Sequence, residues 1–246
     1  MSRPLLAVLA CLLLSSCATE SAATAPPTVD LGQVASLARA RMNEVASATY
    51  RTETTFGSQA DRMINTDVTG VWRHDAAGSW STAHVLRTKP KSYPVVDAVL
   101  VPGSLYWRSA GSSTWKVAPE SEPEAYYSPL GGFALNSGFG AELDYLEPRA
   151  ATLKASGPDR VDGVDTTRYD LEVDPAKFAA LVANPFRRKL HDELVGLNRP
   201  VVARVWVDAT GLPVKAAFEL PFDERRGTTT WFENWGRPVV VETPAL

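Results

Sequence analysis

The sequence predicts an α+β fold in which helices pack on one face of a large, curled antiparallel sheet. Three observations lead to this fold class: one amphipathic helical stretch near the start, many stretches in which apolar and polar side chains alternate, and turn residues between those stretches. Helices gathered on one face of an antiparallel sheet form a stable layered architecture, and a long twisted sheet tends to curl. The 246 residues suffice for one domain with a large core.

The first helix is predicted between Asp30 and Ala48, where apolar residues recur at helical spacing and Asp30 is suited to cap the amino terminus. A short helix is expected near 141–146. A second helical block is expected from Pro175 to Leu197. We expect a break near Pro185 in that block, because proline disfavours helix in the residue before it.

The strands are predicted where the hydrophobic period changes to two, which indicates one buried and one wet face. Turns are expected at 102–104, 162–163 and 209–211, which contain Gly, Pro or Asp. The expected strands are 50–56, 68–72, 80–86, 97–101, 105–109, 114–118, 151–161, 166–174, 201–208, 212–220, 227–236 and 237–244.

The first 28 residues are typical of a lipoprotein signal and tether. Arg3 precedes an apolar run that is too short to span a bilayer, and "LSSC" at 14–17 resembles a bacterial lipobox. We expect residues 1–16 to be a signal peptide, 17–28 a lipidated Cys17 with a flexible tether, and 29–246 one domain. Acyl chains such as palmitate would then anchor the chain to the extracytoplasmic face of the cell membrane. The alternative is a plain secreted protein with a chance cysteine.

Several function classes lack support in the sequence. The net charge of -3 speaks against nucleic acid binding, and the short basic clusters at 187–189 and 224–226 have acidic residues nearby, as expected of solvated surface. Both cysteines lie in residues 1–17, so the domain has no disulfide or cysteine-bound metal. No Gly-x-Ser-x-Gly motif is present, and the histidines lack the spacing of a helical zinc site. We expect no catalytic residue, cofactor or metal, and each histidine to be hydrogen-bonded or exposed: His74, His84 and His191.

Three segments carry a resemblance to a known family: "VDGVDTTRYDLEVD" at 161–174, "ARVWVDATGLPVKAAFEL" at 203–220 and "FENWGRPVVVETP" at 232–244. Together with the lipobox and the first helix, they resemble the actinobacterial LppX/LprAFG-type lipoproteins. The resemblance implies a LolA-like fold, which is a half-barrel of antiparallel sheet closed by helices over an apolar cavity. It also implies binding or transport of an acylated lipid or lipoglycan. The segment 120–148 does not match the family pattern.

Strand parity suggests which side chains would line such a cavity, although a packed core has the same alternation. The predicted lining is Tyr50, Phe56, Trp72, Leu86, Trp107, Tyr169, Leu171, Val205 and Phe218. The aromatic and glycine-rich segment before residue 141 is either an exposed loop or a gate formed by Tyr126, Tyr127, Leu130, Phe133 and Phe139. The alternative function is an envelope scaffold or sensor lipoprotein that has a closed core and no lipid cargo.

Overall fold

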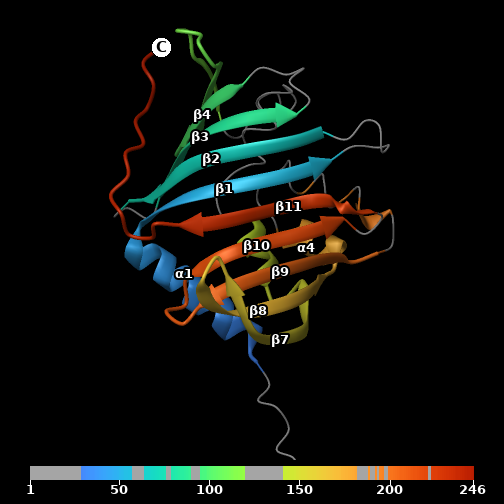
Figure 1. Cartoon of the computed structure of the whole chain (residues 1–246). Coiled ribbons are helices and arrows are strands. Elements are labelled where there is room, and N and C mark those ends of the chain that lie inside the picture. Colours follow the sequence, from blue (N-terminus) through green and yellow to red (C-terminus); the bar gives the residue numbers. More distant parts are fainter. Residues whose placement is uncertain are drawn as a thin grey trace, which may run out of the picture.

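The computed structural model describes residues 29–56, 64–75, 79–89, 95–119, 141–181, 188, 192, 194–196, 199–220 and 223–246. In these ranges, one open antiparallel sheet of 11 strands has the order β6-β5-β4-β3-β2-β1-β11-β10-β9-β8-β7 (Figure 1). The strands are β1 (Ser47–Phe56), β2 (Ile64–His74), β3 (Trp80–Lys89), β4 (Val96–Val101), β5 (Ser104–Ser109), β6 (Lys116–Pro119), β7 (Ala151–Val161), β8 (Val164–Val173), β9 (Val201–Asp208), β10 (Pro213–Leu220) and β11 (Asp223–Glu233). The predicted large antiparallel sheet is confirmed.

The first helix, α1 (Leu31–Val45), begins as the sequence predicts. The Asp30 carboxylate accepts hydrogen bonds from the backbone N–H groups of Gly32, at 2.8 Å, and Gln33, at 3.3 Å. The predicted end near residue 48 is wrong by three residues. Ala46 adopts the left-handed conformation, with φ 61°, which closes the helix and lets β1 begin at the next residue.

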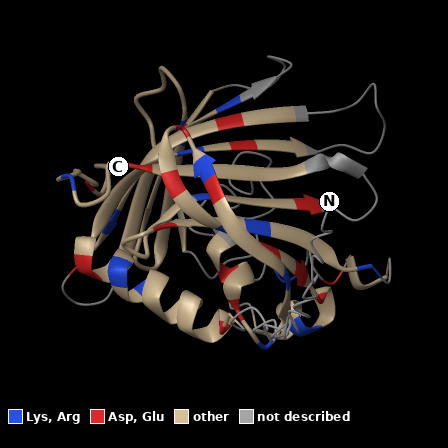
Figure 2. Cartoon of the chain, turned by 60° about the horizontal axis from the view of Figure 1, so that its bottom comes forward, with Lys and Arg blue, Asp and Glu red and all other residues tan. Residues whose placement is uncertain are grey.

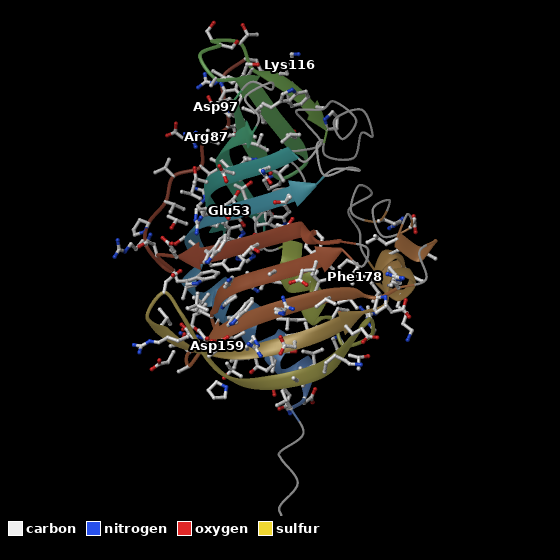
Figure 3. The ribbon with its side chains drawn as sticks, turned by 45° about the vertical axis from the view of Figure 1, so that its right-hand side comes forward. Glu53, Arg87, Asp97, Lys116, Asp159 and Phe178 are labelled. Atoms are coloured by element: carbon white, nitrogen blue, oxygen red, sulfur yellow. The ribbon has the colours of Figure 1, made fainter. Side chains whose placement is uncertain are left out.

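The helices pack on one face of the sheet, which we call the inner face. Figure 2 shows the strands curling over α1. The short 3-10 helix η2 (Ala141–Leu146) lies at the predicted position and packs against α1, β8, β9 and β10. The second α-helix, α4 (Pro175–Leu181), adds Phe178 to the core, where its ring lies 4.8 Å from that of Tyr145 (Figure 3). The predicted layered α+β architecture is therefore confirmed.

The start of the second helical block is also confirmed. Asp174 precedes α4, and its carboxylate accepts from the N–H groups of Ala176, at 3.0 Å, and Lys177, at 3.1 Å. The predicted break near Pro185 falls outside the described residues. These caps show how local sequence positions the helices that cover the inner face.

The two faces of the strands differ as period-two patterning requires. On β9, Val201, Ala203 and Val205 are fully buried on the inner face, while Val202 is 37% exposed on the opposite, outer face. Inner-face side chains from β1 to β5 and from β8 to β11 join those of α1, η2 and α4 in one core cluster. The core therefore extends from β5 to β8, the strands next to the two edges of the sheet.

The segment 237–244, predicted to be a strand, does not join the sheet. Asn234, with φ 54°, and Gly236, with φ 74°, turn the chain after β11 ends. The Ser47 carbonyl accepts from the Gly236 N–H and the Ser47 hydroxyl donates to the Arg237 carbonyl, each at 2.8 Å. The last residues then leave the sheet beyond these contacts, in red in Figure 1.

Candidate functional site

The inner face contains side chains that strand parity predicts to line a cavity. Tyr50, Trp72, Leu86, Trp107, Leu171 and Val205 are buried in the core cluster. Tyr169 and Phe218 are partly buried against it, and burial raises the pKa of the Tyr169 phenol. The side chain of Phe56 and the predicted gate, Tyr126, Tyr127, Leu130, Phe133 and Phe139, lie outside the described residues. That these side chains line a cavity stays a prediction.

One row of inner-face residues crosses the sheet from β11 to β5, and we call it the central row. Strand register places its members side by side: Phe232, Tyr50, Gly70, His84, Ala98 and Trp107. Its aromatic members alternate with glycine and alanine in the half formed by β1 to β5. The row therefore combines bulky rings with small residues in one buried line.

Gly70 lets two polar side chains of the central row meet. The Tyr50 hydroxyl lies 3.2 Å from Nδ1 of His84, on the strand beyond β2. A Cβ at position 70 would lie 2.7 Å from Cζ of Tyr50 and 2.6 Å from Cβ of His84, so no larger residue fits there. The predicted hydrogen-bonded state of His84 is confirmed, and the ring of His74 stacks on that of Trp72 with 6.1 Å between the ring centres. His191 lies outside the described residues.

Buried polar atoms of the inner face include Oγ1 of Thr82 on β3 and Nε1 of Trp107 on β5. Neither of these two atoms has a hydrogen-bond partner in the described part of the chain. Thr82 is fully buried and Trp107 is 8% exposed. Sequence reasoning found Trp107 only as an apolar ring, because the partner of an indole N–H cannot be read from strand parity.

Threonine hydroxyls pair across the join between β1 and β11. The hydroxyls of Thr52 and Thr230 lie 2.8 Å apart, and those of Thr54 and Thr228 lie 3.0 Å apart. The prediction of an apolar lining misses this polar patch. Its signal was present in the sequence, because "TETT" and "TTT" place threonine at alternate positions of both strands.

Aromatic rings pack together on the inner face near the start of β1 and the end of β11, away from the threonine pairs. Trp72 and Phe232 lie 6.1 Å and 6.0 Å from Trp235, whose Nε1 donates to the Pro213 carbonyl at 2.9 Å. The backbone N–H of His74 donates to the carbonyl of Ala46, where α1 ends. Trp72 therefore lies in the closed end of the core, next to α1.

The outer face carries a different row, which alternates cations and tryptophans across β1, β11, β10, β9 and β8. Its members are Arg51, Trp231, Lys215, Trp206 and Arg168. The Arg51 guanidinium lies 4.0 Å from the ring centre of Trp231, and Nζ of Lys215 lies 4.8 Å from that of Trp206. Trp206 and Trp231, which the sequence shows only as tryptophans on strands, thus belong to the outer face.

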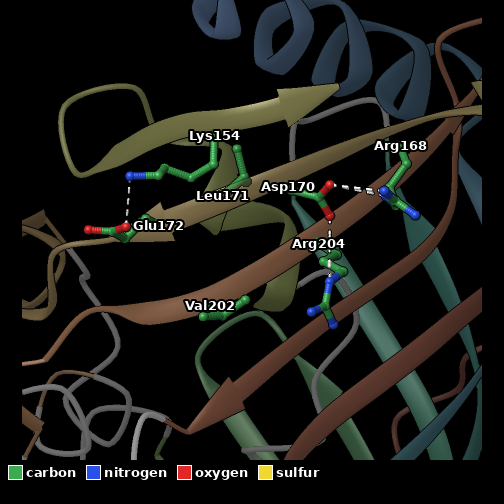
Figure 4. A pocket seen from close by; sticks show the side chains of 7 residues that line it. All are labelled: Lys154, Arg168, Asp170, Leu171, Glu172, Val202 and Arg204. Carbon is green, nitrogen blue, oxygen red and sulfur yellow. Dashed lines mark hydrogen bonds and ion pairs between the residues drawn. The ribbon is translucent and has the colours of Figure 1, made fainter. Parts of the chain in front are cut away.

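Charged groups on the outer face are arranged in pairs. Nε1 of Trp206 donates to Asp159 at 2.9 Å, and this bond lowers the pKa of the Asp159 carboxyl (Figure 3). A depression over β7, β8 and β9 is lined by paired ions (Figure 4). The pairs are Lys154–Glu172 at 3.0 Å, Arg168–Asp170 at 3.1 Å and Arg204–Asp170 at 3.5 Å. The charged side chains that line this depression are therefore paired with one another.

Metal-binding geometry is not found within the described ranges, where no three His, Cys, Asp or Glu side chains gather closely enough to hold an ion. In the same ranges, no helix has the length and apolar character needed to cross a membrane.

Comparison with protein-family models finds no match to this chain. No curated protein matches its sequence either. Among solved structures, LprF from Mycobacterium bovis is similar, with 14% identity, a TM-score of 0.49, and coverage of 87% of this chain and 97% of LprF. A putative outer membrane lipoprotein-sorting protein domain from Vibrio parahaemolyticus has 8% identity, a TM-score of 0.36 and coverage of 83% and 92%. A LolA superfamily protein from Nitrosomonas europaea has 9% identity, a TM-score of 0.30 and coverage of 84% and 92%.

Proposed function

We propose that the protein is an extracytoplasmic lipoprotein that binds, and carries, an acylated lipid or lipoglycan between its sheet and its helices. The observation that carries the proposal is the inner face: a single, largely apolar cluster of buried side chains that extends from β5 to β8 in an open sheet. Ligand sites are typically concave and mostly apolar, with a few polar groups that set orientation. The inner face has this composition.

The chemistry of the inner face favours acyl chains over a charged ligand. Transfer of an acyl chain from water into an apolar site gains about 0.8 kcal/mol per methylene. Among the described residues, the buried polar side chains are all Ser, Thr or His. A buried ion without a countercharge is costly, so the proposed site holds the chains and leaves an ionised headgroup outside.

The amino-terminal segment supplies the proposed anchor. Under this proposal, cleavage before Cys17 removes residues 1–16, and acyl groups on Cys17 hold the domain at the membrane. Residues 18–28 span at most roughly 40 Å when fully extended. This tether would keep the domain close enough to the bilayer to take up or deliver a lipid. The proposed action is physical transfer, with no covalent step on the cargo.

Native mass spectrometry of the full chain, purified in mild detergent from an actinobacterial host, tests both parts. We expect one added mass that survives organic extraction, because it is covalent, and a second that extraction removes, because it is cargo. The Cys17→Ser variant should lose the first mass and keep its first 16 residues.

The alternative function makes a different prediction for the same measurement. A scaffold or sensor lipoprotein would carry the covalent mass alone and would take up no added lipid. That result would refute the carrier and retain the anchor. Loss of the covalent mass with cargo still bound would instead refute the anchor alone.

A further inference from the structure

We infer that Trp107 and Thr82 form a polar subsite on the inner face of β3 to β5, which binds the uncharged ester oxygens of an acylglycerol-type lipid. The inference rests on the proposed function and names the group that the site recognises. It begins from two observations of different kinds: the unpartnered buried atoms, and the lack of buried full charges around them.

Trp107 supplies the most specific group. Its side chain is more than nine-tenths buried, and in the described part of the chain its Nε1 makes no hydrogen bond. The indole N–H is a donor only, so its partner must be an acceptor. Buried polar groups in proteins are nearly always paired. A ligand oxygen would provide the pairing that the described residues do not.

Thr82 supplies a second polar group on the same face. Register pairs Thr82 with Leu100, and Leu100 with Leu105, two residues before Trp107 on β5. The backbones of β3 and β5 are roughly 10 Å apart, since each strand spacing is about 4.8 Å. We therefore assign a separate ligand oxygen to each group. A molecule with several oxygens along a short backbone, such as a diacylglycerol with its two ester carbonyls, suits the spacing.

In the central row, the neighbour of Trp107 on the adjacent strand β4 is a small residue. Ala98, fully buried on β4, is the residue between His84 and Trp107 in the row. Its side chain is a single methyl group, so β4 contributes little bulk beside the indole. Next along the row, the Tyr50 hydroxyl and His84 already bond each other at 3.2 Å. The subsite therefore borders a polar pair on one side and apolar strands on the other.

The surroundings select an uncharged ligand group. The buried polar side chains of the described residues include no Lys, Arg, Asp or Glu. A phosphate or carboxylate at Trp107 would lose its hydration without gaining a countercharge. Ester carbonyl oxygens accept hydrogen bonds and carry no net charge, so they meet both requirements.

Equilibrium binding to the full chain in detergent tests the inference. The probes are dioleoylglycerol and the matched dioleyl ether, which has the same chains but no carbonyl oxygen. The wild-type protein should bind the ester about fivefold to tenfold more tightly than the ether, the effect of about one hydrogen bond. Trp107→Phe, which keeps an aromatic ring but removes the N–H, should reduce this preference by lowering the affinity for the ester more than that for the ether.

Two further variants make the test specific. Thr82→Val keeps the shape of the side chain and should reduce the ester preference, which decides the question if Trp107→Phe does not fold. Trp206→Phe removes an indole N–H on the outer face and should leave the preference intact. Equal wild-type binding of ester and ether, or an unchanged preference in both inner-face variants, would overturn the inference. Failure of the wild type to bind either lipid would instead refute the proposed function.

Discussion

Trp107 and Trp206 are equally buried, at 8% exposed each, but they lie on opposite faces of the sheet. On the outer face, the N–H of Trp206 donates to Asp159 at 2.9 Å and the ring packs against Lys215. On the inner face, the N–H of Trp107 has no partner among the described residues. Tryptophan burial alone therefore does not distinguish a structural residue from a binding residue. The two indoles differ in hydrogen bonding, and on that difference rests our proposal that Trp107 binds lipid.

The same contrast holds for the two faces as a whole. Cation–π contacts and ion pairs connect the outer-face side chains of β1, β7, β8, β9, β10 and β11 to one another. The inner face buries polar atoms at a cost and leaves Oγ1 of Thr82 and Nε1 of Trp107 without a hydrogen-bond partner in the described structure, and the outer face leaves Oγ1 of Thr166 without one. We interpret the outer face as stabilising the sheet, and the inner face as giving up stability for binding.

The largest difference between the faces is expected for glycine substitutions. Gly70→Ala on the inner face would place a Cβ 2.8 Å from the backbone oxygen of Ala83 and against Tyr50, so it should cost about 3 kcal/mol of unfolding free energy. Gly157→Ala on β7 meets nothing within 4 Å and should cost nothing or stabilise slightly. Urea denaturation measures both, and equal losses would contradict the contrast.

Tryptophan substitutions should give opposite results on the two faces. Trp206→Phe loses a cation–π contact, a hydrogen bond and buried ring area, so it should lower the unfolding free energy by at least about 1 kcal/mol. Trp107→Phe removes an unsatisfied donor, which offsets the smaller ring, so the lipid-free protein should change by less than about 0.5 kcal/mol. Thermal unfolding of lipid-free protein compares them. A larger loss for Trp107→Phe would mean that its N–H is satisfied.

Threonine substitutions sharpen the comparison within the inner face. Thr82→Val removes an unpaired hydroxyl and should raise the unfolding free energy by about 0.5–1 kcal/mol. Thr52→Val leaves the hydroxyl of Thr230 without its 2.8 Å partner and should lower it by about 1 kcal/mol. Urea denaturation midpoints measure the difference, provided that the slope of unfolding free energy against urea concentration is the same for each variant. Destabilisation by both variants would argue against an unsatisfied Thr82.

The smallest expected effect is the pH dependence of the outer face. The hydrogen bond from Trp206 lowers the Asp159 pKa below its ordinary 3.8, so the folded state favours the carboxylate. The resulting stability is present above pH 3.8 and is lost as the pH falls through the folded-state pKa. Asp159→Asn should therefore destabilise the protein slightly at neutral pH and less at about pH 2. An equal effect at both pH values would show that Asp159 acts without its charge.

Much of the fold could be predicted because it depends on local chemistry. Asp30 caps α1, the turn at 162–163 joins β7 and β8, and alternation sorts the strand faces correctly. The end of the sheet could not be predicted. The turn at Asn234 directs residues 237–244 away from β11, although the composition of this segment suits a strand. Local patterns specify elements, whereas departures from them depend on neighbours far along the chain.

The sequence predicts which face of the sheet carries the candidate site, but not how its residues pair. Parity alone places Tyr50, Leu86 and Trp107 toward the helices. The role of Gly70 depends on the register that brings His84 beside it, and the bond from Trp206 to Asp159 joins residues 47 positions apart. No pattern in a single sequence encodes those pairings, so the polar subsite can be recognised only from the register of the strands in the structure.

The most direct test is an NMR spectrum of the tryptophan indole N–H groups in the ¹⁵N-labelled full chain, recorded while dioleoylglycerol is added. Trp→Phe variants assign the signals of Trp107 and Trp206. We predict that lipid shifts the Trp107 signal downfield, as a new hydrogen bond requires, and leaves that of Trp206 in place. A Trp107 signal that stays unchanged at saturating lipid, or a shift confined to Trp206, would contradict lipid binding at the inner face.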